Sequence, residues 1–130
     1  MDKPIYAPGQ QVRKFCFRYH PNNTTDVDPR DPDYAVNASE VESIVYSATG
    51  KHCVTLKNRH TKILGVSARF QLETDPGLNT EVRPYGIVDG MSATNLFYLV
   101  TCPAGTAAAV SYAITTWIYV EVTVEEQPNG

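Results

Sequence analysis

The chain has 130 residues, 42% of them hydrophobic, and its 11 Lys and Arg against 14 Asp and Glu give a formal net charge of −3. This length is enough for one domain whose hydrophobic core needs no disulfide or metal. The balanced charge argues against a dedicated nucleic-acid binder, because such proteins carry a clustered basic surface, and the one basic cluster, at residues 57–62, is small. No run of about 18 apolar residues is present, so the sequence predicts no helical membrane span.

The N-terminal residues and the cysteines indicate a reducing compartment. Residues 1–11, MDKPIYAPGQQ, lack the apolar segment of a signal peptide, so we expect synthesis in a cytoplasm without a cleavable leader. Cys16, Cys53 and Cys102 are widely spaced and form no CxxC motif, which argues against a zinc site. We expect reduced, partly buried thiols and no bound cofactor.

The chain begins with a predicted arm and a predicted strand. Residues 1–10 hold two Pro, one Gly and few apolar side chains, a composition typical of an extended arm. Residues 11–19 alternate between apolar and polar side chains, which predicts the first strand. Phe15, Phe17 and Tyr19 share one face of that strand.

Residues 20–39 form a polar insertion with three Pro, four Asp and three Asn, which predicts an irregular surface loop. A loop this long in a small domain is usually functional or disordered. Its aspartates could offer oxygen ligands to calcium, but their spacing lacks the central Gly and the terminal Glu of an EF-hand loop. We therefore expect a solvated acidic loop, with calcium binding as the alternative. The four aspartates are Asp26, Asp28, Asp31 and Asp33.

Residues 41–73 carry the clearest strand pattern. Residues 41–47 and 51–57 predict a β-hairpin, with Gly50 at the turn position that requires a positive φ. Residues 63–73 then alternate almost without fault, which indicates a strand with one packed face and one solvated face. The side chains expected in the core are Leu64, Val66, Ala68, Phe70 and Leu72, and those expected in solvent are Ser67, Arg69, Gln71 and Glu73.

The last third of the chain predicts three further strands. Residues 80–88 contain Pro84, which suits an edge strand or a bulge. Residues 95–102 are nearly all apolar, as in a strand covered on both faces. Residues 111–125 alternate throughout, with an aliphatic row from Ile118 to Val124 on the predicted core face.

About seven strands with regular turn signals, and no helical stripe, predict an all-β protein. We expect a single β-sandwich or jelly-roll-like domain over residues 11–125, preceded by the extended arm. Residues 126–130 should form a polar tail.

One face of the last strand suggests a protein interface. Trp117 and Tyr119 project opposite to the aliphatic row, and aromatic residues are enriched at subunit contacts. The alternative, given equal weight, is that a second sheet of the same chain packs on that face. The candidate interface residues are Trp117, Tyr119, Tyr34, Arg83 and Tyr85.

No arrangement of residues predicts catalysis. No Ser lies in a GxSxG nucleophile elbow. Cys53 adjoins His52, but neighbours on a strand point to opposite faces, so we expect a packed thiol beside a surface imidazole. A paired-carboxylate glycosidase site needs a cleft, for which so short a chain has little room. We expect a protein without enzymatic activity.

Residues 41–124 resemble a pattern found in small structural proteins of tailed bacteriophages. In those proteins a Ser-x-x-Gly-x-x-x-Val-Thr-Leu segment and a short polar loop precede a strand that begins with Leu and Val. A GTAA-type turn and a terminal strand of alternating aliphatic residues follow. The insertion at residues 20–39 departs from that pattern. The matching positions are Ser47, Gly50, Val54, Thr55, Leu56, Leu64, Val66, residues 105–108 and Ile118 to Val124.

The resemblance implies a virion component, most directly a capsid decoration (cement) protein on the outer capsid surface. Its partner would then be the major capsid protein or another virion protein, with no nucleic acid or membrane involved. Symmetric oligomers are the common case, and a homotrimer would fit the local threefold positions of a capsid. The arm and the long loop would lie across neighbouring subunits.

Two alternatives stay open. A single jelly-roll coat protein would form the shell itself, but coats that package nucleic acid usually have a basic arm, and only Lys3 precedes residue 13. A fibre-tip module that binds a receptor or a carbohydrate would instead use exposed aromatic rings, such as Tyr34, Tyr85 and Trp117, to stack on sugars.

Overall fold

The computed structural model of the chain describes residues 11–21, 25–58, 60–71, 80–90, 94–103 and 116–126. These residues form eight strands and contain no helix. The strands are β1 (Gln11–Tyr19), β2 (Ala35–Val36), β3 (Val41–Ala48), β4 (Lys51–Leu56), β5 (Lys62–Gln71), β6 (Thr80–Val88), β7 (Leu96–Pro103) and β8 (Trp117–Glu126). The expected arm and residues 127–130 of the expected tail lie outside the described residues, as do residues 111–115 of the predicted last strand.

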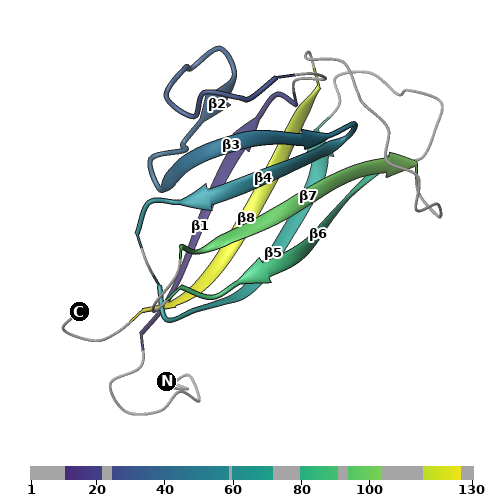
Figure 1. The fold of residues 1–130 in the computed structure, drawn as a ribbon. Helices are drawn as coiled ribbons and strands as arrows, with labels where there is room; N and C mark the ends of the chain where they lie inside the picture. The colour runs from purple at the N-terminus through teal and green to yellow at the C-terminus, as the bar shows by residue number, and fades with distance from the viewer. Residues whose placement is uncertain are drawn as a thin grey trace, which may run out of the picture.

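Two antiparallel four-stranded sheets pack face to face as a β-sandwich (Figure 1). The first sheet has the order β2-β1-β8-β5 and the second has the order β3-β4-β7-β6. The strands β1 and β8 are neighbours at the centre of the first sheet, and they pair from Gln11 opposite Glu126 to Tyr19 opposite Ile118. The prediction of an all-β protein is confirmed.

The predicted number of seven strands is wrong by one short strand inside the expected loop. The two residues of β2, Ala35 and Val36, pair with the end of β1. Ala35 is buried and Val36 is half-buried, so burial of apolar surface favours a short strand here despite the turn-forming residues around it. Val27, earlier in the same loop, is also buried and forms a bridge with Ile44 of β3. The loop is therefore tied to both sheets.

The core lies between the sheets and is built from alternate residues of the strands. Every second residue of β8 from Ile118 to Val124 is fully buried, as the aliphatic row predicts. Phe17 and Tyr19 of β1 belong to the same cluster, which Phe97 of β7 completes from the other sheet. Full burial of such a side chain stabilises the fold by about 1.5–3 kcal/mol.

In β5 the first side chain that points into the core is one residue earlier in the chain than the sequence predicts. A β-bulge lies between Ile63 and Gly65, and it leaves Leu64 outside the pairing register. Ile63 is 7% exposed and Leu64 is 46% exposed. The predicted core position of Leu64 is therefore wrong, because the extra residue of a bulge shifts the alternation. Beyond the bulge, the side chains that pack against the core as predicted are Val66, Ala68 and Phe70.

The strands β3 and β4 form the predicted hairpin. Gly50 has a φ of 67°, a backbone conformation that glycine adopts without steric cost. Its carbonyl oxygen accepts a hydrogen bond from the backbone N–H of Thr101 at 2.8 Å, which ties the turn to β7.

The second sheet leaves an apolar face outside the core. β6 is an edge strand, as Pro84 predicts. β7 lies between β4 and β6, and its inward residues Phe97 and Leu99 are buried, but Tyr98 and Val100 are only half-buried. The prediction that this strand is covered on both faces is therefore wrong, because the first sheet covers its inner face alone.

Candidate interaction surfaces

The five predicted interface residues lie in three different places. Trp117 and Tyr119 share the outer face of the first sheet, and the second sheet packs on the opposite face, so the alternative of a sheet covering them is wrong. Arg83 and Tyr85 lie on the outer face of the second sheet, where both are exposed. Tyr34 packs against the core beside the short strand β2. The structure thus separates the candidates into two opposite faces and one structural tyrosine.

Cross-strand register assembles arginines and aromatic rings on the outer face of β1, β8 and β5. Tyr119 of β8 pairs with Arg18 of β1 on one side and with Arg69 of β5 on the other. Trp117 lies two residues before Tyr119, and His20 directly follows β1. We call this cluster the arginine–aromatic face, and its members are Arg18, His20, Arg69, Trp117 and Tyr119.

Each aromatic ring of this face is in contact with a nitrogen-bearing side chain. The Cζ atom of Arg18 lies 4.5 Å from the ring centroid of Trp117, and that of Arg69 lies 4.7 Å from the ring centroid of Tyr119. The imidazole of His20 lies 3.5 Å, centroid to centroid, from the Trp117 ring, and its Nδ1 donates to a backbone carbonyl oxygen at 2.8 Å. Cation–π contacts at exposed sites contribute about 0.5–1 kcal/mol each, and here they hold both guanidinium groups in place.

The two arginines of this face form no ion pair with the part of the chain that the structure describes. The other arginines in that part, Arg13, Arg30 and Arg83, each pair with a glutamate. A guanidinium carries five N–H donors in a planar fork that matches a carboxylate or a phosphate. The arginine–aromatic face therefore presents two positioned guanidinium groups that an anionic group could bind.

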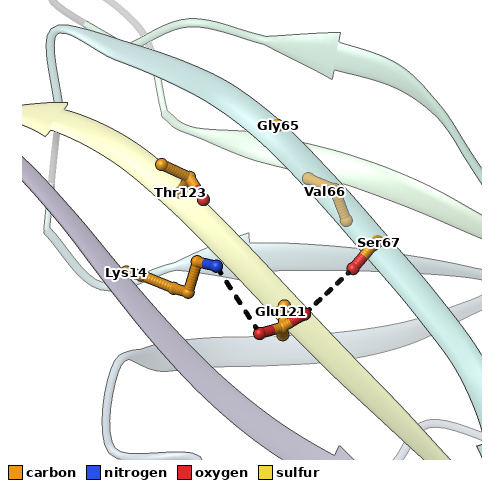
Figure 2. A pocket seen from close by; sticks show the side chains of 6 residues that line it. All are labelled: Lys14, Gly65, Val66, Ser67, Glu121 and Thr123. Atoms are coloured by element: carbon orange, nitrogen blue, oxygen red, sulfur yellow. Dashed lines mark hydrogen bonds and ion pairs between the residues drawn. The ribbon is translucent and has the colours of Figure 1, made fainter.

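A polar hollow of about 210 Å³ lies on the same outer face (Figure 2). It exists because Gly65 has no side chain opposite Thr123, and a Cβ atom on Gly65 would meet no atom within 4 Å. The carboxylate of Glu121 lies 3.7 Å from Nζ of Lys14 and accepts a hydrogen bond from Oγ of Ser67 at 3.4 Å. Figure 2 shows Lys14 and Ser67 reaching Glu121 from two sides, so its negative charge is balanced locally.

The outer face of the second sheet has an apolar row at its centre. Val45, Cys53, Tyr98 and Tyr85 pair in one row across all four strands. The rings of Tyr85 and Tyr98 stack with their centroids 5.3 Å apart, and Val45 and Tyr85 are each 40% exposed. An exposed apolar surface of this kind is typical of a protein-interaction site. We call it the tyrosine face, and its members are Val45, Cys53, Tyr85, Val88 and Tyr98.

His52 and Cys53 point to opposite faces of β4, but in the reverse sense to the prediction. His52 is buried, with its ring centroid 6.0 Å from that of Tyr19 and 6.1 Å from that of Tyr46. Cys53 is half-buried on the outer face. The predicted surface imidazole is wrong, because the register of the hairpin turns His52 toward the core. The two side chains cannot act on one substrate as a catalytic pair.

The three cysteines are free thiols of different exposure. Cys16 and Cys53 are half-buried, one on each outer face, and Cys102 is buried. Burial raises the pKa of the Cys102 thiol. A hydrogen bond with Cys16 raises the pKa of Tyr119, so its phenol is neutral at pH 7. The expectation of partly buried thiols is confirmed for Cys16 and Cys53, whereas Cys102 is fully buried.

The acidic loop, residues 26–33, is folded by its own aspartates. Asp26, Asp28 and Asp33 are exposed, as a solvated loop requires. Three of the four carboxylates use Oδ1 to bind backbone N–H groups. The donors are Tyr46 to Asp26 at 2.8 Å, Arg30 to Asp28 at 2.9 Å, and Asp33 to Asp31 at 3.0 Å. The bonds to Asp28 and Asp31 close turns within the loop, and the bond from Tyr46 ties the loop to β3, so the loop has a fixed shape.

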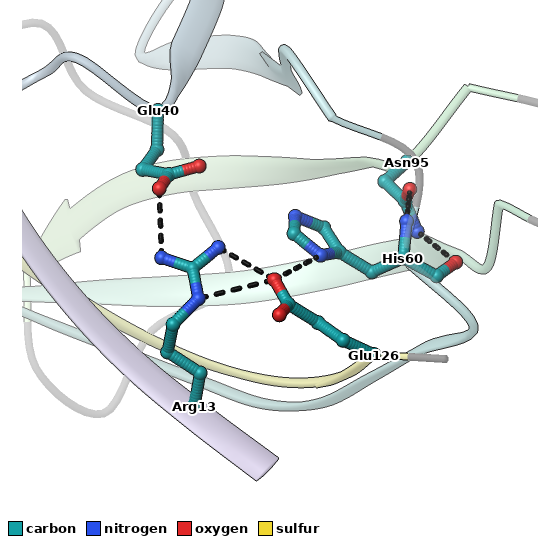
Figure 3. Close-up of polar contacts among 5 residues, drawn as sticks. All are labelled: Arg13, Glu40, His60, Asn95 and Glu126. Atoms are coloured by element: carbon teal, nitrogen blue, oxygen red, sulfur yellow. Dashed lines mark hydrogen bonds and ion pairs between the residues drawn. The ribbon is translucent and has the colours of Figure 1, made fainter. Parts of the chain in front are cut away.

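A polar cluster that the sequence did not reveal lies where β1 begins and β8 ends (Figure 3). Arg13 donates from Nε and Nη2 to Oε1 of Glu126 at 3.0 and 2.6 Å, and from Nη1 to Oε1 of Glu40 at 2.7 Å. Nδ1 of His60 lies 3.2 Å from the same oxygen of Glu126. Asn95 holds the backbone of His60 through two further hydrogen bonds. Glu126, predicted as the start of a polar tail, is the last residue of β8.

The cluster fixes the charge state of its members. The hydrogen bond from Arg13 lowers the pKa of Glu126, and the hydrogen bond to Glu40 raises the pKa of Arg13. Burial lowers the pKa of His60, which is 1% exposed. Its Nε2 has no hydrogen-bond partner among the described residues, so a second ring proton would be buried without an acceptor. No local spacing marks these residues, because they come from five separate segments of the chain.

Neither a helix able to cross a membrane nor a group of three metal-ligating side chains occurs in the described residues. Compared with protein-family models, with curated proteins and with solved structures, the chain gives no match. What the two outer faces can do follows from their residues. Stacked arginines bind anionic groups, and an exposed apolar row gains free energy when another protein covers it.

Proposed function

We propose that this chain is a structural protein of a bacteriophage virion, a capsid decoration protein that binds the outer capsid surface as a trimer and stabilises the shell. The observation that carries the proposal is the tyrosine face, an ordered apolar row across four strands that is exposed on a rigid sandwich. Proteins bury such surfaces against partners. A jelly-roll-like sandwich is the architecture that we propose for this role.

The resemblance to small phage structural proteins supports the same role. Several of its matching positions are scaffold residues: Gly50 forms the hairpin turn, and Val54 and Leu56 are buried in β4. The alternating aliphatic residues of the terminal strand are the fully buried row of β8. Residues 105–108 lie outside the described residues. The resemblance thus concerns the framework that presents the two outer faces.

The tyrosine face is the surface that we assign to the capsid. It is the more apolar of the two faces, and Arg83 beside it is already paired with Glu81. Burial of apolar area is the main favourable term in protein association, and an arginine that keeps its ion pair adds no unpaired charge to the interface.

A fibre-tip module that stacks on sugars is the second candidate function, and the aromatic residues bear on it directly. The Trp117 ring already contacts Arg18 and His20 of its own chain. Tyr34 packs against the core, and Tyr85 stacks on Tyr98. These contacts leave less ring surface for a sugar, which favours a protein partner.

The test is co-sedimentation of the purified chain with capsids that lack it, produced from the genome that encodes it. We expect saturable binding to the capsid exterior and a higher melting temperature of the loaded capsid. The double variant Y85S/V88S should weaken binding at least about tenfold, because it removes exposed apolar area from the contact. The control variant K57A changes an exposed residue that follows β4 and is not a member of either face, and it should bind normally. Absence of the chain from purified particles would overturn the proposal, and assembly of the purified chain into closed shells would favour the coat alternative.

A further inference from the structure

The arginine–aromatic face carries an excess of positive charge on a chain whose net charge is negative. The chain has a formal charge of −3, yet Arg18, Arg69 and Lys14 lie together on the outer face of the first sheet. Glu121 in the same region is balanced by Lys14. The positive charge of Arg18 and Arg69 is therefore not neutralised within the described residues.

The negative counterpart is the acidic loop. It holds four aspartates and one arginine, and that arginine, Arg30, is paired with Glu42 at 3.8 Å. The loop lies at the edge of the sandwich where β2 and β3 are found, bridged to β3 through Val27 (Figure 1). The arginine–aromatic face extends in the other direction, across β1 and β8 to β5. Within one chain the two surfaces form no ion pair among the described residues.

Both surfaces are already ordered. The guanidinium groups are held over aromatic rings at 4.5 and 4.7 Å. The loop is held by backbone hydrogen bonds to its own carboxylates and by the buried side chain of Val27. Surfaces that are fixed before contact lose little conformational entropy on binding, so more of the interaction energy appears as affinity.

We propose that the acidic loop of one copy of this chain docks on the arginine–aromatic face of the next copy. The contact joins two different surfaces of the molecule, so it is head-to-tail. Repetition of it closes a ring such as a trimer when the rotation between copies closes, and otherwise gives a filament. The aspartates of the loop would give Arg18 and Arg69 the carboxylate partners that the other described arginines already have. The inference deepens the self-association included in the proposed function, and it does not depend on the virion.

The test is sedimentation velocity of the full chain and three variants over a range of protein concentration. R18E/R69E reverses the charge of the face. D28N/D31N/D33N removes charge from the loop but keeps the amide oxygens that can accept the backbone N–H bonds of Asp28 and Asp31. K51E/K57E is the control. It changes the net charge as much as R18E/R69E does, but Lys51 begins β4 and Lys57 follows it, so neither belongs to the acidic loop or to the arginine–aromatic face.

We expect the wild type and the control to associate, and each of the other two variants to dissociate about 100-fold more readily, because like charges placed together, or the loss of one partner of a charge pair, weaken an interface. An equimolar mixture of R18E/R69E and the loop variant should form a heterodimer but no larger ring, because the intact loop of the first variant can dock on the intact face of the second, whereas the reverse contact has lost both of its surfaces. Self-association of the wild type should weaken as salt is added.

A wild type that stays monomeric at every concentration would overturn the inference, and so would a folded R18E/R69E that associates like the wild type. Monomeric wild type that binds a DNA oligonucleotide would instead identify phosphate as the partner of the arginines. If circular dichroism shows that R18E/R69E does not fold, the self-association of the loop variant is the test of the contact. Association of that variant equal to that of the wild type would overturn the inference. Loss of self-association with retained capsid binding would reject this contact but not the virion role.

Discussion

Arg13 and Glu126 join the beginning of the first strand to the end of the last. Two N–H groups of the Arg13 guanidinium donate to one carboxylate oxygen of Glu126, at 3.0 and 2.6 Å, across 113 positions of the chain. A third N–H reaches Glu40, just before β3. One arginine therefore ties together both ends of the domain and the start of the second sheet.

Removal of this arginine should destabilise the fold. In Arg13→Ala, Glu40 and Glu126 lose their shared cation, and Oε2 of Glu40 is already a buried atom without a hydrogen-bond partner in the described residues. Because the Arg13 side chain is 37% exposed, solvent screens part of the loss, and we expect a cost of about 1–2 kcal/mol. Urea denaturation measures it. Arg18→Ala serves as the matched control, and equal midpoints for the two variants would contradict a special role for Arg13.

Acidification should destabilise the protein in two steps. Burial lowers the pKa of His60 from 6.5. Below pH 6.5 the imidazole is therefore protonated more fully in the unfolded chain than in the folded chain, and the free energy of unfolding decreases as the pH falls. The pKa of Glu126 is lowered from 4.5 by Arg13, so its contribution is present above pH 4.5 and is lost as the pH falls toward the folded value.

Thermal melts across this pH range test both steps. His60→Gln should remove the dependence near pH 6.5 and keep the one below pH 4.5, whereas Glu126→Gln should remove the lower one. A wild-type melting temperature that rises as the pH falls through 6.5 would show that His60 is not the buried neutral group described above.

Truncation of two adjacent residues of β5 should change the free energy of unfolding by very different amounts. Ile63→Ala should cost about 2–4 kcal/mol, because it removes a buried side chain and leaves a cavity. Leu64→Ala, one residue along, should change stability by less than about 0.5 kcal/mol, since Leu64 is 46% exposed. Guanidinium denaturation of the two variants distinguishes the bulged register from regular alternation, which predicts the reverse order.

Substitution of two glycines by alanine should likewise have different effects on stability. Gly86 has a φ of 61°, and a Cβ atom there would lie 2.9 Å from the Tyr98 ring, so Gly86→Ala should cost at least about 1–2 kcal/mol. Gly65 faces the open hollow, and Gly65→Ala should stay within about 0.5 kcal/mol of the wild type. Differential scanning calorimetry is suitable for both. Comparable losses in the two variants would mean that the space above Gly65 is filled.

Much of the secondary structure could be predicted from local pattern, whereas the candidate surfaces could not. Residues 11–19 and 80–88 are strands with the predicted bounds, and Gly50 forms the predicted turn. Trp117 and Tyr119 were correctly placed together outside the aliphatic row. Tyr85, another candidate interface residue, lies on a different face, and only the pairing of strands shows that β8 and β6 belong to different sheets.

The sequence by itself determined that this is an all-β chain, and it determined which side of β1 and which side of β8 is apolar. Those properties depend on the two-residue period of a strand, which neighbouring residues set. The tertiary structure alone decided that Ile63 rather than Leu64 enters the core, that Glu126 ends a strand beside Arg13, and that two arginines flank Tyr119. Each of these depends on hydrogen-bond register between segments far apart in the chain, and such register is fixed only when the two sheets close on a common core.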